Sequence, residues 1–308
     1  MADPSTLVIG TRGSPLALRQ AHEVEDRLAA ALGWDKAQLP LSVIKTTGDA
    51  IQDRPLSEAG GKGLFTKELD MALLEGAIDL AVHSAKDLPT RLPEGLVIAG
   101  YLPREDVRDA FISGVAPTLA ALPRGAVMGS ASLRRQAQIK RARPDIEVTL
   151  LRGNVGTRLA KVESGAIAAT LLAVAGLKRL GLMDHVTAFL DTDDFLPAVG
   201  QGAIALMTRA DDARTRGFVG AVSDQATGVA LAAERAFLTV LDGSCRTPIA
   251  GHARTGDDRV RFRGLVLRPD GSDCVEVAGD GVLADAERIG YDAGRDLKAR
   301  MPAGMLDV

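Results

Sequence analysis

Short apolar runs alternate with helix-forming segments through the first two thirds of the chain, and this alternation most restricts the possible fold. Residues 7–10 form an apolar run of strand length. Ser14 and Pro15 follow, with the residue types favoured at an N-cap and a first helical position. Gly33 ends the apolar periodicity of that helix. Strands alternating in this way with helices favour an α/β fold with a largely parallel sheet.

The same pattern continues through two successive runs. In the first run we predict strands at 41–46, 78–83 and 96–101 and a helix at 65–75. In the second run, residues 106–196, we predict strands at 110–113, 126–129, 147–151 and 169–173, with helices beginning near Ser132, Asn154 and Ala175. Residues 203–208 read as a strand that returns to the first run.

The last segment has a different order of elements. We predict a helix at 227–241, strands at 249–253, 260–267 and 274–277, and a final helix at 284–300. That order indicates a small α+β domain. The predicted domains are therefore an α/β domain 1 of residues 1–102 and 203–222, an α/β domain 2 of residues 103–202, and an α+β domain 3 of residues 223–308.

Composition narrows the classes of function. The formal net charge of −3 gives no reason to expect nucleic acid as a partner. The first ten residues lack the features of a secretory signal, and no apolar run reaches membrane-spanning length, so we expect no membrane partner. The two cysteines are expected to be reduced thiols. The four histidines are dispersed, so the sequence predicts neither a metal site nor a Ser–His–Asp triad.

Arginines recur where predicted strands end and helices begin, which is where open α/β sheets bind ligands. The residues are Arg12, Arg134, Arg135, Arg152 and Arg158. Arg134 and Arg135 have two open interpretations, a solvated basic helix face or an anion site at a helix N-terminus. Three such loops in two domains suggest a cleft that holds several carboxylates or phosphates. Nucleotide binding is disfavoured, because the glycines around Lys62 lack phosphate-loop spacing.

Three further residues have both a structural and a functional interpretation. Asp87 follows the most apolar strand and either makes a turn or faces a substrate amine or pyrrole N–H. Cys245 either packs as a small apolar residue or is a thiol activated beside Arg246. Arg179 is either a surface cation near a helix end or a cleft residue.

Eight blocks in order, spanning about residues 7 to 250, resemble the porphobilinogen deaminase family. They are 10–18 (GTRGSPLAL), 61–69 (GKGLFTKEL), 79–89 (DLAVHSAKDLP), 132–136 (SLRRQ), 152–159 (RGNV and TRL), 196–202 (LPAVGQG), 234–238 (ERAFL) and the turn at Cys245. Each block is weak by itself, but eight in order are specific. Residues past 255 match poorly, as expected of a variable region.

The resemblance implies two α/β domains, similar to periplasmic binding proteins, that flank a cleft, and a third domain that carries a thioether-linked dipyrromethane cofactor. It implies a cytoplasmic, monomeric transferase of tetrapyrrole (haem) biosynthesis. Such an enzyme condenses four porphobilinogen molecules head to tail on the dipyrromethane primer. Ammonia is lost at each addition, and hydroxymethylbilane is released by hydrolysis.

The resemblance also implies roles for individual residues. Asp87 is the central acid/base and stabilises positive charge on pyrrole nitrogens. The other implied catalytic residues are Lys86, Arg12, Arg152 and Arg158. The implied cofactor contacts are Ser14, Lys86, Asp87, Ser132, Arg134 and Arg135, with covalent attachment at Cys245. The implied substrate contacts are Arg12, Gln20, Arg152, Arg158, Arg179 and Gln201. Lys62 and Phe65 belong to a loop that could close over the cleft.

The chain departs from the family pattern at three places. Where the family often has Tyr-Asp, this chain has Ile167-Ala168. Where the family often has Gly-Ile-Glu, it has Ala205-Leu206-Met207, and where the family usually has Gly-Gly before the cysteine, it has Gly243-Ser244. None of these removes a residue assigned to the chemistry. Two other functions compete: a solute-binding protein with the same cleft, and an inactive regulatory relative. A covalently bound chromophore distinguishes the enzyme from the solute-binding protein, and the retention of Asp87, Cys245 and the arginines argues against the inactive relative.

Overall fold

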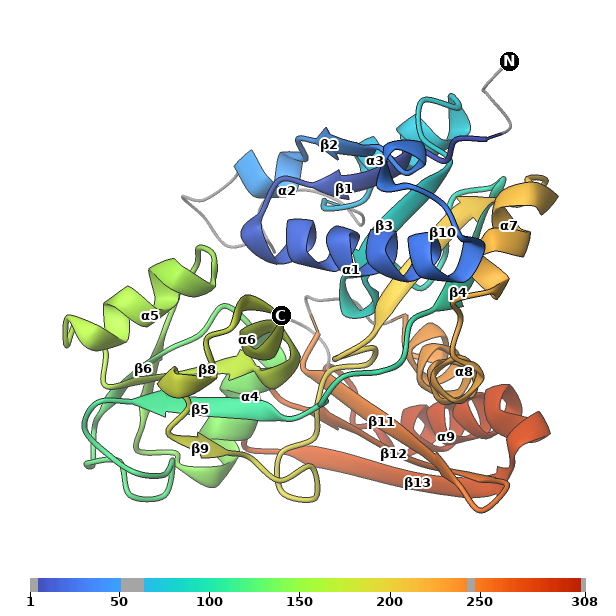
Figure 1. Cartoon of the computed structure of the whole chain (residues 1–308). Coiled ribbons are helices and arrows are strands. Elements are labelled where there is room, and N and C mark those ends of the chain that lie inside the picture. Colours follow the sequence, from blue (N-terminus) through green and yellow to red (C-terminus); the bar gives the residue numbers. More distant parts are fainter. Residues whose placement is uncertain (1–4, 51–63, 243–246, 306–308) are drawn as a thin grey trace. The chain divides into compact units, whose positions relative to one another are not determined.

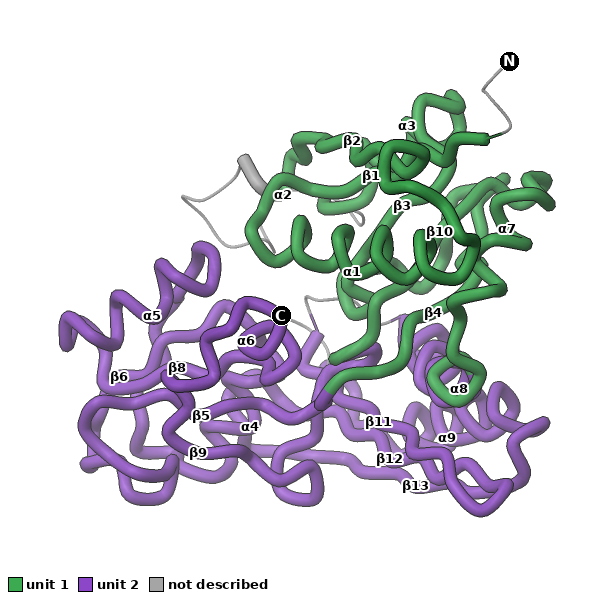
Figure 2. The backbone as a smooth tube through the Cα atoms, in the orientation of Figure 1, with its two compact units in different colours: residues 1–51, 59–105, 202–228 green, residues 52–58, 106–201, 229–308 purple. Residues whose placement is uncertain are grey.

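A computed structural model describes residues 5–50, 64–242 and 247–305, with the side chains of residues 49 and 50 excepted. The chain divides into two compact units (Figures 1 and 2). Unit 1 comprises residues 1–51, 59–105 and 202–228. Unit 2 comprises residues 52–58, 106–201 and 229–308. Lys62 and Cys245 lie outside the described residues.

Unit 1 is built on a five-stranded sheet of order β2-β1-β3-β10-β4. The strands are β1 (Ile9–Arg12), β2 (Leu41–Ile44), β3 (Leu80–Ser84), β4 (Leu96–Tyr101) and β10 (Ile204–Arg209). β1 pairs in parallel with β2 and β3, whereas β10 runs antiparallel to both β3 and β4. The predicted return of the chain to this sheet is confirmed. The sheet is largely parallel, and the returning strand is the antiparallel exception.

Helices cover this sheet and set the positions of its loops. They are α1 (Pro15–Leu32), α2 (Thr47–Ala50), α3 (Lys67–Leu74) and α7 (Ala213–Gly220), with short 3₁₀ turns η1 (Lys36–Gln38) and η2 (Ala85–Asp87). Ser14 caps α1 as predicted, because its side chain accepts a hydrogen bond from the Ala17 N–H, and Gly33 ends the helix at φ +66°. Apolar residues of α1, α7 and the strands form one core.

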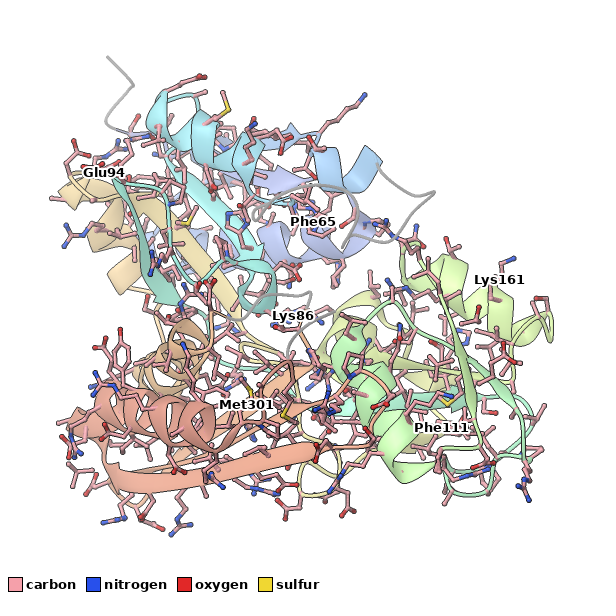
Figure 3. The ribbon with its side chains drawn as sticks, turned by 180° about the vertical axis from the view of Figure 1, so that it is seen from behind. Phe65, Lys86, Glu94, Phe111, Lys161 and Met301 are labelled. Carbon is pink, nitrogen blue, oxygen red and sulfur yellow. The ribbon has the colours of Figure 1, made fainter. Side chains whose placement is uncertain are left out.

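A second five-stranded sheet, of order β7-β6-β8-β5-β9, lies in unit 2. Its strands are β5 (Asp109–Ser113), β6 (Val127–Gly129), β7 (Glu147–Thr149), β8 (Ala169–Ala173) and β9 (Ala188–Phe189). Its helices are α4 (Leu133–Ala142), α5 (Val155–Glu163) and α6 (Val174–Leu180), with the 3₁₀ turn η3 (Met183–His185). Phe111 packs in a core with Ile139 of α4 on one face (Figure 3), and Ala110 and Ile112 pack with α5 and α6 on the other.

The third sheet consists of the antiparallel strands β11 (Ile249–Gly256), β12 (Arg259–Leu267) and β13 (Cys274–Val282). The helices α8 (Gln225–Val240) and α9 (Ala286–Arg300) pack with one face of it, and η4 (Leu283–Asp285) precedes α9. Fully buried Glu234 of α8 accepts hydrogen bonds from the N–H groups of Gly200 and Ala253. This carboxylate joins α8 to β11 and to the chain before β10.

These elements confirm the predicted fold class of two α/β sheets and a small α+β part. The helix predicted at 65–75 begins two residues later, at Lys67, and the strand predicted at 274–277 extends to Val282. The proposed boundary between domains 2 and 3 stays a prediction, since both segments belong to unit 2. No helix in the described ranges is long and apolar enough to cross a membrane.

Candidate active site

In unit 1 the predicted residues meet at the carboxyl ends of two neighbouring parallel strands. β1 ends at Arg12, and β3 leads into Lys86 and Asp87. The Arg12 Nη1 and Asp87 Oδ2 atoms are 3.8 Å apart, too far for a hydrogen bond, and Asp87 is 32% exposed. Within the described ranges, the Asp87 carboxylate accepts no hydrogen bond. It is therefore accessible to a donor group on a ligand.

Arg12 also contacts the predicted loop residue Phe65. The Arg12 guanidinium lies 4.2 Å from the centroid of the Phe65 ring, within the range of a cation–π interaction. Phe65 and Lys86 are marked in Figure 3. Lys86 is exposed, whereas Ser14 is only partly exposed because it caps α1. Phe65 thus helps to orient the cation that stands nearest Asp87.

Two buried polar residues support this edge of the sheet. The Gln20 side chain is 4% exposed, and its amide hydrogen-bonds the Ser84 hydroxyl at 3.0 Å, immediately before η2. His83 is also 4% exposed, and its Nε2 atom has no hydrogen-bond partner in the described ranges. Burial, with a smaller contribution from Arg12, lowers the pKa of His83 from 6.5 to about 4. The imidazole is therefore neutral at neutral pH.

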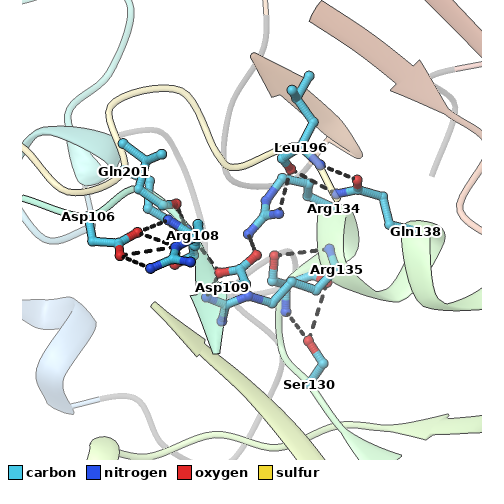
Figure 4. A network of polar contacts seen from close by, with 11 residues as sticks. Asp106, Arg108, Asp109, Ser130, Arg134, Arg135, Gln138, Leu196 and Gln201 are labelled. Atoms are coloured by element: carbon cyan, nitrogen blue, oxygen red, sulfur yellow. Dashed lines mark hydrogen bonds and ion pairs between the residues drawn. The ribbon is translucent and has the colours of Figure 1, made fainter. Parts of the chain in front are cut away.

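In unit 2 the predicted arginines surround a carboxylate that sequence reasoning missed. Asp109, the first residue of β5, is fully buried. Its Oδ2 accepts from Arg134 at 2.7 Å and its Oδ1 from Arg135 at 2.7 Å (Figure 4). The Gln201 amide donates to the same Oδ1 at 2.9 Å. Burial alone raises the pKa of Asp109, but the two guanidiniums outweigh it and hold that pKa well below its usual range.

This arrangement decides between the two interpretations of Arg134 and Arg135. Both are buried, so they do not form a solvated helix face. Each keeps a buried Nε atom without a hydrogen-bond acceptor in the described ranges. Ser132 caps α4 by accepting from the Arg135 N–H.

One sequence signal could have revealed Asp109. It is an aspartate at the start of an apolar strand, and a carboxylate that is buried in such a position must be paired.

A second group of cations lies at the start of α5. Arg158 donates from Nε to the Gly153 carbonyl at 3.0 Å, and no described carboxylate pairs with it. Burial lowers the pKa of Arg158 to about 10, with further contributions from the nearby charges of Arg135 and Arg152. Mutually repelling guanidiniums favour an anionic ligand. Arg179 lies in the last turn of α6 and is partly exposed.

The structure therefore brings Arg12, Phe65 and Asp87 together in unit 1. It brings Arg134, Arg135 and Gln201 together around Asp109 in unit 2, with Arg158 close enough to Arg135 and Arg152 for their charges to interact. Within the described ranges no cluster of His, Cys, Asp and Glu could hold a metal ion. The cations of unit 2 suit the carboxylates of a ligand, and the accessible carboxylate of unit 1 suits an N–H donor.

Two family models together match most of the chain. One, described as "Porphobilinogen deaminase, dipyromethane cofactor binding domain", matches residues 7–217. The other, described as "Porphobilinogen deaminase, C-terminal domain", matches residues 229–299. The second match includes residues 256–299, a segment whose sequence by itself resembled the family poorly.

Curated relatives are similar over nearly their whole length. A porphobilinogen deaminase of Nitrobacter hamburgensis is 58% identical over 95% of this chain and 92% of its own. A porphobilinogen deaminase of Paracoccus denitrificans is 54% identical over 100% of this chain and 98% of its own.

Among solved structures, one match is a periplasmic substrate-binding protein of an ABC transporter from Coxiella burnetii. It is 14% identical over 72% of this chain and 94% of its own, with a TM-score of 0.46. Another is the periplasmic aliphatic sulphonate binding protein SsuA from Escherichia coli. It is 17% identical over 78% of this chain and 71% of its own, with a TM-score of 0.42.

Replacing the buried carboxylate should strongly destabilise unit 2. We expect Asp109→Asn to lower the free energy of unfolding by about 3–5 kcal/mol, because two buried guanidiniums lose their counter-charge. The matched control is Asp106→Asn, whose partner Arg108 is 40% exposed, and it should cost about 1 kcal/mol or less. Urea denaturation of both variants measures this. Equal losses would mean that the burial of Asp109 has no energetic consequence.

His83 should make stability depend on pH. Its pKa is about 4 in the folded chain against 6.5 when unfolded, so the unfolded chain binds more protons between these values. Stability is therefore fully present above pH 6.5 and falls as pH falls toward 4, by about 1.4 kcal/mol per pKa unit. In the variant His83→Gln, the free energy of unfolding should fall less between pH 7 and pH 5 than it does in the wild type. Denaturation curves at the two pH values measure this. His185→Gln, at a 37% exposed side chain, should decline like the wild type. A His83→Gln curve parallel to the wild type's would refute the assignment.

Proposed function

The chain belongs to the porphobilinogen deaminase family, and we propose that its chemistry takes place at Asp87 and the arginines of the strand ends. It is a transferase of tetrapyrrole (haem) biosynthesis. It condenses four porphobilinogen molecules head to tail onto a covalently bound dipyrromethane primer, releasing ammonia and then hydroxymethylbilane. The observation that carries the proposed site is the accessible Asp87 carboxylate, 3.8 Å from Arg12.

The residues present fit the dipyrromethane cofactor. Each of its pyrroles bears an acetate and a propionate, so a binding site needs several cations. Arg135, Arg152 and Arg158 lie close enough for their charges to interact, and the buried Nε of Arg135 lacks an acceptor among the described residues. Carboxylates placed there would relieve the repulsion and supply the missing acceptor.

When bound, dipyrromethane supplies the nucleophilic pyrrole carbon on which the chain is extended. We assign its carboxylates to Ser132, Arg134 and Arg135 in unit 2 and to Ser14 and Lys86 in unit 1. Its attachment is assigned to Cys245, outside the described residues. Asp109 orients Arg134 and Arg135, because it binds one nitrogen of each guanidinium.

Asp87 accepts hydrogen bonds from pyrrole N–H groups and stabilises the positive charge that develops when ammonia leaves. Its carboxylate is suited to this because it is accessible and accepts no hydrogen bond from a described residue. Arg12 stands beside it and is held by the Phe65 ring. We propose that Arg12 binds a substrate carboxylate there and so orients the reacting pyrrole toward Asp87.

The remaining assignments concern the substrate carboxylates. Arg152, Arg158 and Arg179 are proposed to bind the acetate and propionate groups that each added pyrrole brings. Gln20 and Gln201 remain predicted substrate contacts. Their described hydrogen bonds, to Ser84 and Asp109, also suit a role in positioning those neighbours. Lys62 and Phe65 are the proposed closing loop.

The partner is a small molecule, porphobilinogen. That the enzyme is a cytoplasmic monomer, with neither nucleic acid nor a membrane as partner, stays a prediction. The formal net charge of −3 supports the exclusion of nucleic acid.

The intact mass of the denatured protein tests the primer and its anchor together. We expect an excess equal to two pyrrole units in the wild type and none in Cys245→Ser, because a serine oxygen does not replace the thioether sulfur. The control is Cys274→Ser, which should keep the excess. Cys274 is a free, partly buried thiol whose pKa burial raises to about 11. Loss of the excess in Cys274→Ser, or its retention in Cys245→Ser, would place the anchor elsewhere.

Asp87→Asn should abolish most turnover without unfolding the chain. We expect the rate of porphobilinogen consumption per primed molecule to fall by about 10²–10⁴-fold, the usual contribution of a general acid or base. The intact mass of the same sample gives the primed fraction and separates lost catalysis from lost primer. Asp292→Asn is the control, because that carboxylate pairs with exposed Arg288 on α9. Wild-type turnover in Asp87→Asn would exclude this role.

A further inference from the structure

The two faces of the β11–β13 sheet differ in character. Side chains alternate between the faces of a sheet. Ala253, Val260 and Phe262 belong to the core shared with α8 and α9. The alternate residues of β11 and β12 therefore face the other side. In the antiparallel register they form the pairs Ala250 with Leu265, His252 with Arg263, Arg254 with Arg261, and Gly256 with Arg259.

One end of this second face is covered by apolar packing. Ala250, Leu265 and Leu267 pack there against Ala137 of α4 and Leu196. Farther along, the β11 and β12 residues on this face are basic side chains and a glycine, namely His252, Arg254, Gly256, Arg259, Arg261 and Arg263. On β13 the same face carries Glu276, Ala278, Asp280 and Val282. No residue assigned to the family's chemistry is among them.

A pocket lies where the segment from Thr192 to Leu196 meets this basic face. Its volume is about 350 Å³, within the range of small-molecule sites. Its lining includes four arginines and one carboxylate, that of Asp193, so the lining is strongly positive. All of it belongs to unit 2.

The carboxylates around the pocket do not satisfy every arginine. Asp193 accepts from Arg263 at 3.0 Å and lies 3.6 Å from Arg254. On β13, Asp280 pairs with Arg259, and Glu276 lies 3.9 Å from Arg263. Arg261 has neither a hydrogen bond nor an ion pair within the described part of the chain.

Arg261 stands directly opposite Arg254 on β11 and directly opposite Asp280 on β13, and the Asp280 carboxylate pairs with the neighbouring Arg259. Like charges directly opposite each other, as in Arg254 and Arg261, destabilise a sheet. An anion between the two guanidiniums would reverse the sign of this interaction, and the planar forks of both suit phosphate or carboxylate oxygens.

We propose that this pocket is a second anion site, which binds a small multivalent anion bearing phosphate or carboxylate groups through Arg254 and Arg261. The site lies apart from the residues of the proposed function and does not depend on that function. A compact ligand is favoured over a long polyanion, because the Thr192–Leu196 segment and the packed end of the sheet bound the pocket.

The bound anion would stabilise the segment that lines the pocket. Arg254 donates a hydrogen bond to Thr192 Oγ1. A ligand bound to Arg254 is therefore linked to this segment through that hydrogen bond. The Leu196 carbonyl accepts from Arg134 at 2.8 Å and from Gln138 at 3.0 Å (Figure 4). The segment therefore connects the pocket to the Asp109 network.

Binding to the full-length primed protein tests the proposal, with inorganic pyrophosphate and citrate as probes at constant ionic strength. Calorimetry should give saturable binding that Arg261→Gln weakens about tenfold, the effect of losing a charge-assisted hydrogen bond. Arg158→Gln, at the proposed substrate site, and Arg288→Gln, on exposed α9, should each bind within about twofold of the wild type. Preference for one probe identifies the ligand as phosphate-bearing or carboxylate-bearing.

Hydrogen exchange locates the bound probe. We expect slower exchange in peptides covering residues 189–197 and 250–263. Unchanged affinity in Arg261→Gln, or protection confined to residues 132–135 and 152–158, would overturn the proposal, the latter because the probe then occupies the substrate arginines. Binding of neither probe, or of an oligonucleotide alone, would overturn it as well. Both experiments measure binding and not turnover. A failure of the proposed enzymatic function would therefore not be mistaken for a failure of the proposed anion site.

Discussion

The ion pairs of Asp109 are the interaction on which the arrangement of unit 2 depends. One fully buried carboxylate holds Arg134 and Arg135 of α4 and the Gln201 amide. Charges taken out of water are tolerated only when they are paired and hydrogen-bonded. The network therefore sets the position of α4 relative to β5, and through the Leu196 carbonyl it also holds the chain that leads to β10.

The same electrostatic constraint supports the anion site proposed in unit 2. Asp109 neutralises part of the charge of Arg134 and Arg135, whereas no described carboxylate pairs with Arg158. Burial and neighbouring guanidiniums lower the pKa of Arg158, which supports the proposal that it binds an anionic ligand. In unit 1, the Asp87 carboxylate is open to a donor.

Fold likeness alone would have left the function open. One fold serves many functions. The choice between an enzyme and a solute-binding protein came from the ordered sequence blocks and from relatives above 50% identity. Family membership assigns the reaction.

Local patterns in the sequence determined the α/β class, the cap at Ser14, and the placement of Arg12, Asp87 and Arg158 at ends of strands or starts of helices. These features depend on neighbours in the chain, so short patterns predict them. Only the tertiary structure decided that β10 enters its sheet antiparallel, that Asp109 binds two arginines 25 and 26 residues away, and that Arg254 faces Arg261 beside the Thr192–Leu196 segment. Such pairings depend on register and burial between distant segments, which no local pattern records.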